Sequence, residues 1–92
     1  MNGRALVAWN IRKLRVERGI SQEQLAADAG IDRSYMSRLE RGIENPTVSI
    51  IEKLAAVLSA ELADFFVVPE PNAEPPGSLT RGRKPRSKPT SA

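Results

Sequence analysis

Cysteine and histidine, two residue types that carry much of enzyme chemistry, are absent from the 92 residues. Without cysteine there is no disulfide framework and no thiolate metal site. Without either residue, a zinc site would need carboxylates alone, and the commonest general base and nucleophile are missing. We therefore expect a protein that is not an enzyme and that holds no metal or other cofactor.

Long apolar runs are also absent. The first 15 residues carry Arg4, Arg12, Lys13 and Arg15 without an uninterrupted apolar stretch, which argues against a signal peptide. No other stretch is long enough to cross a membrane. These absences predict a cytoplasmic protein without a membrane partner.

Residues 1–68 carry no excess of positive charge, because they hold nine Lys/Arg and nine Asp/Glu. Residues 69–92 hold five basic residues against two acidic ones, and six of the seven prolines. Such a segment buries too little apolar surface to offset its chain entropy. We therefore expect one domain over residues 1–68, followed by a disordered, Pro-rich basic tail over residues 69–92.

Apolar residues recur at helical spacing through residues 1–68, and no useful length alternates with period two. Val7, Ile11 and Leu14, for example, follow the i, i+4, i+7 pattern of one helix face. The pattern predicts an all-α, compact five-helix domain. Its helices are expected at about residues 4–18, 22–29, 33–41, 46–58 and 61–66.

The second and third of these helices would form a helix-turn-helix unit over residues 21–42. Ser21 is expected to cap the second helix, with Gln24 three residues on as in a capping box. Asp32 is expected to cap the third helix. Between them, Gly30 must adopt a positive φ, which would cost a residue with a Cβ about 1–2 kcal/mol.

Several motifs surround this unit in a fixed register. They are Ile-Arg-Lys-Leu-Arg (11–15), Gly-Ile-Ser-Gln-Glu-Gln-Leu-Ala (19–26), Ser-Arg-Leu-Glu-Arg-Gly (37–42), Asn-Pro-Thr (45–47) and Ile-Glu-Lys-Leu-Ala (51–55). With these motifs, residues 11–66 resemble the lambda-repressor/Cro-type (XRE) helix-turn-helix domain of DNA-binding transcription regulators. Residues 32–42 are particularly similar to the controller proteins of restriction–modification systems.

The resemblance implies that residues 33–41 form a recognition helix in the major groove of double-stranded DNA. The residues expected to read bases are Arg33, Ser34, Tyr35, Ser37 and Arg38. Arg33 and Arg38 are the strongest candidates because a guanidinium can donate two hydrogen bonds to guanine. The alternative is an ordinary solvated helix face.

The resemblance also assigns contacts outside the base-reading set. Gln22, Arg41 and Asn45 are expected to contact phosphates. Arg15 and Glu40 are expected to form a structural ion pair that ties the first helix to the third. Such a pair would also explain why an acidic residue is tolerated on a DNA-binding helix.

An apolar run at residues 65–68 either closes the core or belongs to a two-fold interface. Family members commonly dimerise through the fifth helix, so Leu62, Phe65 and Phe66 are candidate interface residues. A homodimer would read DNA half-sites one helical turn, ~34 Å, apart. Trp9 is interpreted as a packing or dimer-edge residue.

Two residues near this interface depart from the family pattern. Ser59 stands where a Gly usually ends the fourth helix, so we expect either a left-handed Ser59 or a different helix end. Glu61 replaces the usual hydroxyl cap of the fifth helix, an unfavoured choice at that position.

The tail carries Thr-Arg-Gly-Arg-Lys-Pro-Arg at residues 80–86, similar to the AT-hook. Arg81, Gly82 and Arg83 would then follow a narrow minor groove, although the Lys before Pro85 departs from the AT-hook pattern. The alternative is a basic tail that attracts phosphates without specificity.

Together these observations predict a sequence-specific DNA-binding transcription regulator, nucleoid-associated when bound, with no small-molecule ligand. A rival hypothesis is an antitoxin that binds a toxin through the tail and represses its own operon. A protein partner is therefore an open alternative.

Overall fold

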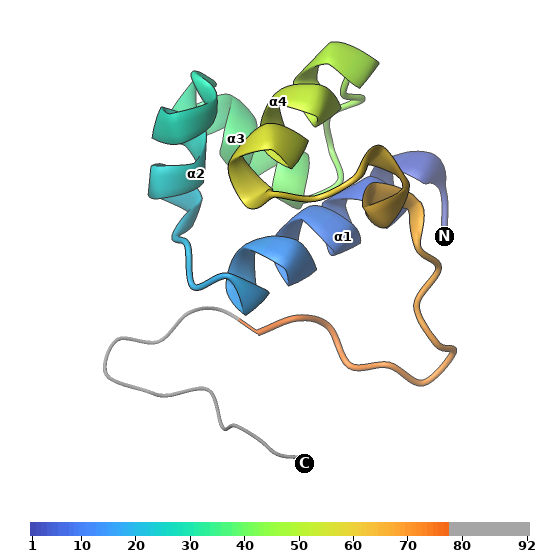
Figure 1. Cartoon of the computed structure of the whole chain (residues 1–92). Helices are drawn as coiled ribbons and strands as arrows, with labels where there is room; N and C mark the ends of the chain where they lie inside the picture. Colours follow the sequence, from blue (N-terminus) through green and yellow to red (C-terminus); the bar gives the residue numbers. More distant parts are fainter. Residues whose placement is uncertain (78–92) are drawn as a thin grey trace.

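The computed structural model describes residues 1–77, which form helices connected by short turns and contain no strand (Figure 1). The helical class agrees with the sequence prediction, but the last element is a short 3-10 helix instead of a fifth α-helix. The elements in chain order are α1 (Gly3–Glu17), α2 (Gln22–Ala29), α3 (Arg33–Glu40), α4 (Val48–Leu58) and the 3-10 helix η1 (Leu62–Phe66). No helix within residues 1–77 is long and apolar enough to cross a membrane.

Each α-helix begins at a side chain that accepts a hydrogen bond from the backbone N–H three residues on, which satisfies one of the free donors of the first turn. These capping residues are Asn2, Ser21, Asp32 and Thr47. The capping box predicted at Ser21 is only half present. The Gln24 backbone N–H donates to Ser21 Oγ at 3.0 Å, but the Gln24 side chain donates to Asp28 Oδ1 at 2.8 Å, one helical turn further on.

The core lies where α1 meets α3, α4 and η1, with α2 packed on α3 and α4 (Figure 1). The most deeply buried apolar side chains come from every one of these elements, so no helix can bury its apolar face alone. They include Ile11, Leu25, Met36, Leu39, Leu54, Leu58 and Phe65.

A left-handed residue lies at the end of each α-helix, and in two helices it is the capping residue itself. Gly30 ends α2 at φ 69°, and Ile31 N–H then donates back to Ala26 O at 2.8 Å. Ser59 ends α4 at φ 53°, so the left-handed alternative foreseen for this residue is the one adopted. At the start of η1, Glu61 donates its backbone N–H to Asp64 Oδ2 at 2.9 Å, which supplies the local polar contact there.

A buried amide fastens the chain after η1 to the first helix. Asn10 is 2% exposed, and its Nδ2 donates to Phe65 O at 3.2 Å and to Val67 O at 3.0 Å. Residues 69–77 then run back along α1 without helix or strand, turning at Pro71 and Asn72 (Figure 1).

Candidate nucleic-acid interface

The helix-turn-helix unit is held from inside by apolar contacts between its two helices. Leu25 and Ala26 of α2 and Met36 and Leu39 of α3 are all at most 1% exposed and belong to one core cluster. Ala26 carries only a methyl group, which lets the two helices approach closely. Because this side of α3 is filled, its opposite side is left to face outward.

The outward side of α3 carries the residues predicted to read DNA. Arg33, Ser34 and Arg41 are exposed, whereas Tyr35, Ser37 and Arg38 are half-buried. A shallow polar hollow lies between the first turns of α2 and α3. It is lined by Ser21, Gln22, Glu23, Arg33, Ser34 and Ser37.

The inward polar edge of α3 is tied to α1 by a buried ion pair. Arg15 Nε lies 2.6 Å from Glu40 Oε2, and Arg15 Nη2 lies 2.9 Å from Glu40 Oε1. The two side chains are 7% and 2% exposed. This is the contact that the family resemblance implies, and its two parallel hydrogen bonds fix the relative position of the helices.

The side chain of Gln22 contributes to this ion pair. Its Nε2 donates to Glu40 Oε1 at 3.2 Å, so one of its donors points inward and not toward a DNA strand. Gln22 is the first residue of α2, and Glu40 can still accept a hydrogen bond beside Arg15. These two facts explain the inward direction of the Gln22 side chain. A phosphate contact by Gln22 stays a prediction.

Both arginines proposed to read bases have a carboxylate partner within the protein. Arg33 pairs with Glu23 of α2, where both side chains are largely exposed. Arg38 Nε lies 2.6 Å from Glu44 Oε2, and these side chains are 41% and 28% exposed. Sequence reasoning identified the arginines and missed both acids.

Tyr35 is a second neighbour of the Arg38 guanidinium, beside Glu44. The guanidinium carbon of Arg38 lies 5.8 Å from the centre of the Tyr35 ring, within the range of a cation–π contact. Burial raises the pKa of Tyr35 above its usual 10.0, and the Glu44 carboxylate raises it further, while Arg38 acts in the opposite direction. The phenol is therefore neutral at physiological pH and can donate a hydrogen bond.

A left-handed glycine explains why Glu44 reaches back to α3. Gly42 has φ 75°, and the next residue donates its N–H to Arg38 O at 3.1 Å. This turn folds residues 43–45 over the end of α3. The Gly42 in the sequence was the available signal for this reversal, but it did not identify which side chain would return.

The remaining predicted DNA contacts lie apart from the hollow. Arg41 and Asn45 are exposed and follow the end of α3. Arg81, Gly82 and Arg83, which would form an AT-hook under one of the two interpretations of the tail, lie outside the described residues.

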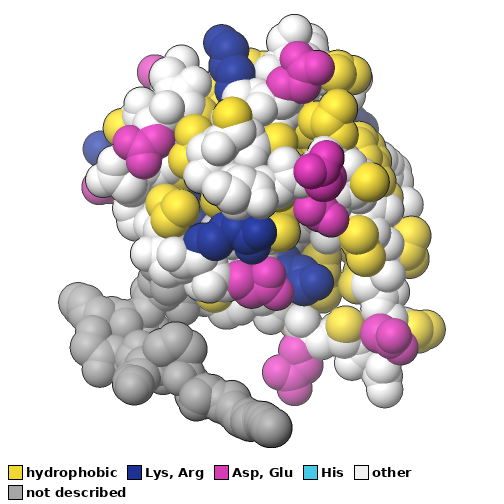
Figure 2. Space-filling model, in the orientation of Figure 1, with side chains coloured by type: hydrophobic (Ala, Val, Ile, Leu, Met, Phe, Trp, Pro, Cys, Tyr) yellow, Lys and Arg dark blue, Asp and Glu magenta, His cyan; other side chains and the backbone are white. Residues whose placement is uncertain are grey.

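The apolar run after α4 divides into a buried and an exposed part. Phe65 is 0% exposed, so its assignment to a dimer interface is wrong. Its ring fills the core between α1 and α4, whereas Leu62, Phe66, Val67 and Val68 are 40–75% exposed. We call these four residues the apolar surface. Figure 2 shows hydrophobic side chains gathered at this side of the molecule.

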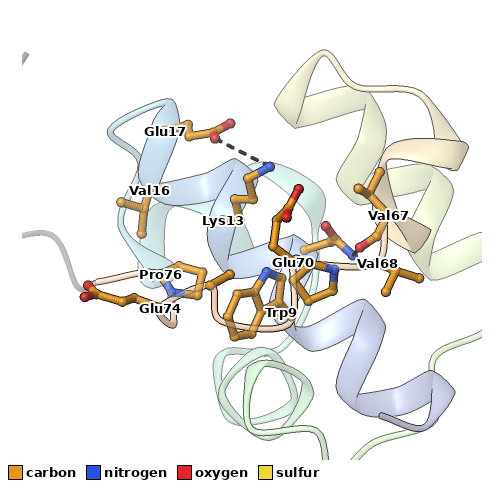
Figure 3. A pocket seen from close by; sticks show the side chains of 12 residues that line it. Trp9, Lys13, Val16, Glu17, Val67, Val68, Glu70, Glu74 and Pro76 are labelled. Carbon is orange, nitrogen blue, oxygen red and sulfur yellow. Dashed lines mark hydrogen bonds and ion pairs between the residues drawn. The ribbon is translucent and has the colours of Figure 1, made fainter. Parts of the chain in front are cut away.

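Beside the apolar surface, residues 67–76 and α1 enclose an open pocket of about 490 Å³. Figure 3 shows Trp9 in this pocket, near Glu70 and Pro76 of the returning chain. Lys13 lies at its edge, 3.9 Å from Glu17. Trp9 and the segment that follows the domain thus line the same pocket.

Comparison with known proteins places this geometry in a family. Residues 11–65 match the helix-turn-helix family HTH_3. The chain is 43% identical over 67 residues to a hypothetical transcription factor of Neisseria meningitidis, covering 73% of the chain and 63% of that protein. A crystal structure of the Neisseria factor superposes with a TM-score of 0.71, covering 74% of this chain and 78% of that chain.

Two further relatives carry named regulatory roles. The restriction–modification controller protein C.AhdI of Aeromonas hydrophila is 40% identical, with a TM-score of 0.66, covering 68% of this chain and 96% of that one. The transcriptional regulator SinR of Bacillus subtilis is 36% identical over 58 residues, covering 62% of this chain. The chain spans 63% of the length of the Neisseria protein and 52% of that of SinR.

Proposed function

Because the chain belongs to the HTH_3 helix-turn-helix family, we propose that it is a transcription regulator that binds a two-fold operator as a homodimer. The observation that carries this proposal is the asymmetry of α3. Its inner side is fixed to α1 through Arg15 and Glu40, and its outer side presents Arg33, Ser34 and Arg38.

The outer side of α3 suits the major groove, which admits a single α-helix. Arg33 and Arg38 would read base edges, with Ser34, Tyr35 and Ser37 as neighbouring contacts. Arg41 and Asn45, beyond the end of α3, would contact phosphates and set the register of the helix. The nearly neutral charge of residues 1–68 fits this assignment, because specificity then rests on base contacts more than on general attraction to phosphate.

The apolar surface supports the homodimer. Exposed clusters of large apolar side chains on a small domain commonly mark partner sites. A two-fold contact there would place one α3 at each end of the dimer, and half-sites one turn of DNA, ~34 Å, apart would follow. Relatives named as regulators and controllers, not as enzymes, agree with such a role. The antitoxin alternative stays a prediction.

Selection from a random duplex library, followed by competition against bulk DNA at physiological salt, tests the regulator. We expect a selected site with two-fold symmetry that outcompetes bulk DNA by at least ~10³-fold, the lower range for specific binders. If no sequence outcompetes bulk DNA, the proposal fails. Sedimentation at micromolar concentration tests the dimer separately, and a monomer there and on the selected DNA would contradict it.

A further inference from the structure

Arg38 differs from Arg33, the other arginine of α3, in how closely its guanidinium is held. Its Nε donates to Glu44 at 2.6 Å, and its guanidinium lies over the Tyr35 ring. Within residues 1–77, neither of its two terminal amino groups donates a hydrogen bond. The guanidinium is thus fixed on one side and has unused donors on the other.

The partner of Arg38 is itself held in place. Glu44 is 28% exposed and follows the left-handed turn at Gly42, which returns the chain over the end of α3. Arg33 and Glu23 provide the contrast, since those side chains are 71% and 65% exposed and have no aromatic contact among the described residues. An exposed pair is worth little and holds neither side chain firmly.

We propose that Glu44 is a positioning residue for DNA recognition, which holds Arg38 Nε so that the two terminal amino groups face a base edge as a preorganised pair of donors. This inference rests on the proposed function. An ordered guanidinium loses less conformational entropy when it forms a two-bond contact with a base. The Glu44 carboxylate also balances the charge of Arg38, so that phosphates of unrelated DNA gain less from this arginine.

The experiment compares binding of the full chain to its selected operator and to bulk DNA. Glu44→Ala should lower the preference for operator over bulk DNA by about tenfold, because the fork of Arg38 loses its support. Bulk DNA should be bound no more weakly than by the wild type.

Two control variants accompany this test. Glu44→Gln keeps an acceptor for Arg38 Nε and should retain the preference within about threefold, so the proposal can still be tested if the alanine variant folds poorly. Glu52→Ala removes an exposed acid of α4 that makes no ion pair or hydrogen bond within the described residues, and it controls for charge.

A double-mutant cycle with Arg38→Ala isolates the coupling. In that background Glu44→Ala should change the preference by less than about twofold, because no fork remains to be positioned. The proposal is overturned if Glu44→Ala leaves the preference intact, if it weakens operator and bulk DNA equally, or if the two substitutions act additively. A wild-type chain without a preferred sequence would overturn the regulator and this inference together. A wild-type preference that survives Glu44→Ala would overturn only the inference.

Discussion

The two sides of α3 use the same ion-pair chemistry in different surroundings. On the inner side Arg15 and Glu40 are 7% and 2% exposed, whereas on the outer side Arg33 and Glu23 are 71% and 65% exposed. Water and salt screen the outer pair, so under the proposed function DNA would replace Glu23 at little cost. In the buried inner pair, neither water nor DNA can take the place of a lost partner. Burial, and not the identity of the residues, separates a structural contact from an exchangeable one.

Breaking the inner pair should have the largest effect. Arg15→Ala leaves Glu40 buried without its main partner and should lower the free energy of unfolding by about 3–5 kcal/mol, measured by urea denaturation. Glu23→Ala, the matched change on the outer side, should alter it by less than about 1 kcal/mol. Equal losses for the two variants would contradict the contrast between the sides.

Removing an outer arginine should affect DNA binding and leave the fold intact. Arg38→Ala should weaken operator binding by about 1–3 kcal/mol and relax specificity at one base pair, because one base loses its pair of donors. Competition with single-substituted operators measures both effects. A uniform loss on every sequence would instead identify Arg38 as a phosphate contact.

A substitution at Ser59 should stabilise the domain, so that the two sides of α3 can be compared again in a more stable chain. This residue has φ 53°, which glycine adopts without steric cost, so Ser59→Gly should raise the free energy of unfolding by about 0.5–1 kcal/mol after the unfolded-state entropy is included. Ser49→Gly within α4 is the matched control and should lower it by about 0.5 kcal/mol. Destabilisation by Ser59→Gly would show that the Ser side chain contributes a contact.

The smallest effect concerns the only tyrosine of the chain. Because the folded pKa of Tyr35 is raised, its contribution to stability is fully present below pH 10.0 and is lost as pH rises from there through the folded value. Glu44→Gln should lower this pKa, since the carboxylate is one of its causes, and phenolate absorbance against pH measures the change. Identical titration curves for variant and wild type would place Glu44 away from the ring in solution.

The contacts of α2 and α3 that depend on nearby sequence could be predicted, and those that depend on chain reversal could not. Ser21 and Asp32 bond to backbone three residues away, so their roles are visible in the sequence. Glu23 is ten residues from its partner, and Glu44 reaches Arg38 only after the Gly42 turn.

At η1 a different feature could not be predicted from the sequence, namely which apolar residues are buried. The apolar run 65–68 has no period that distinguishes the buried Phe65 from the exposed Phe66. The run is also too short to reveal a 3-10 helix in place of an α-helix.

Asn10 gives the domain an order of completion during synthesis. Its side chain bonds to carbonyls 55 and 57 residues later in the chain, at Phe65 and Val67. A nascent chain that has released α1 to α4 but not η1 holds this amide only by its bond to Leu6 O, 3.0 Å away within α1, and lacks both of the later acceptors. Helix α3 therefore leaves the ribosome before the core that holds it is complete. Residues 62–67 supply the contacts of the core that come last in the chain, the buried Phe65 ring and the two carbonyls that accept from Asn10.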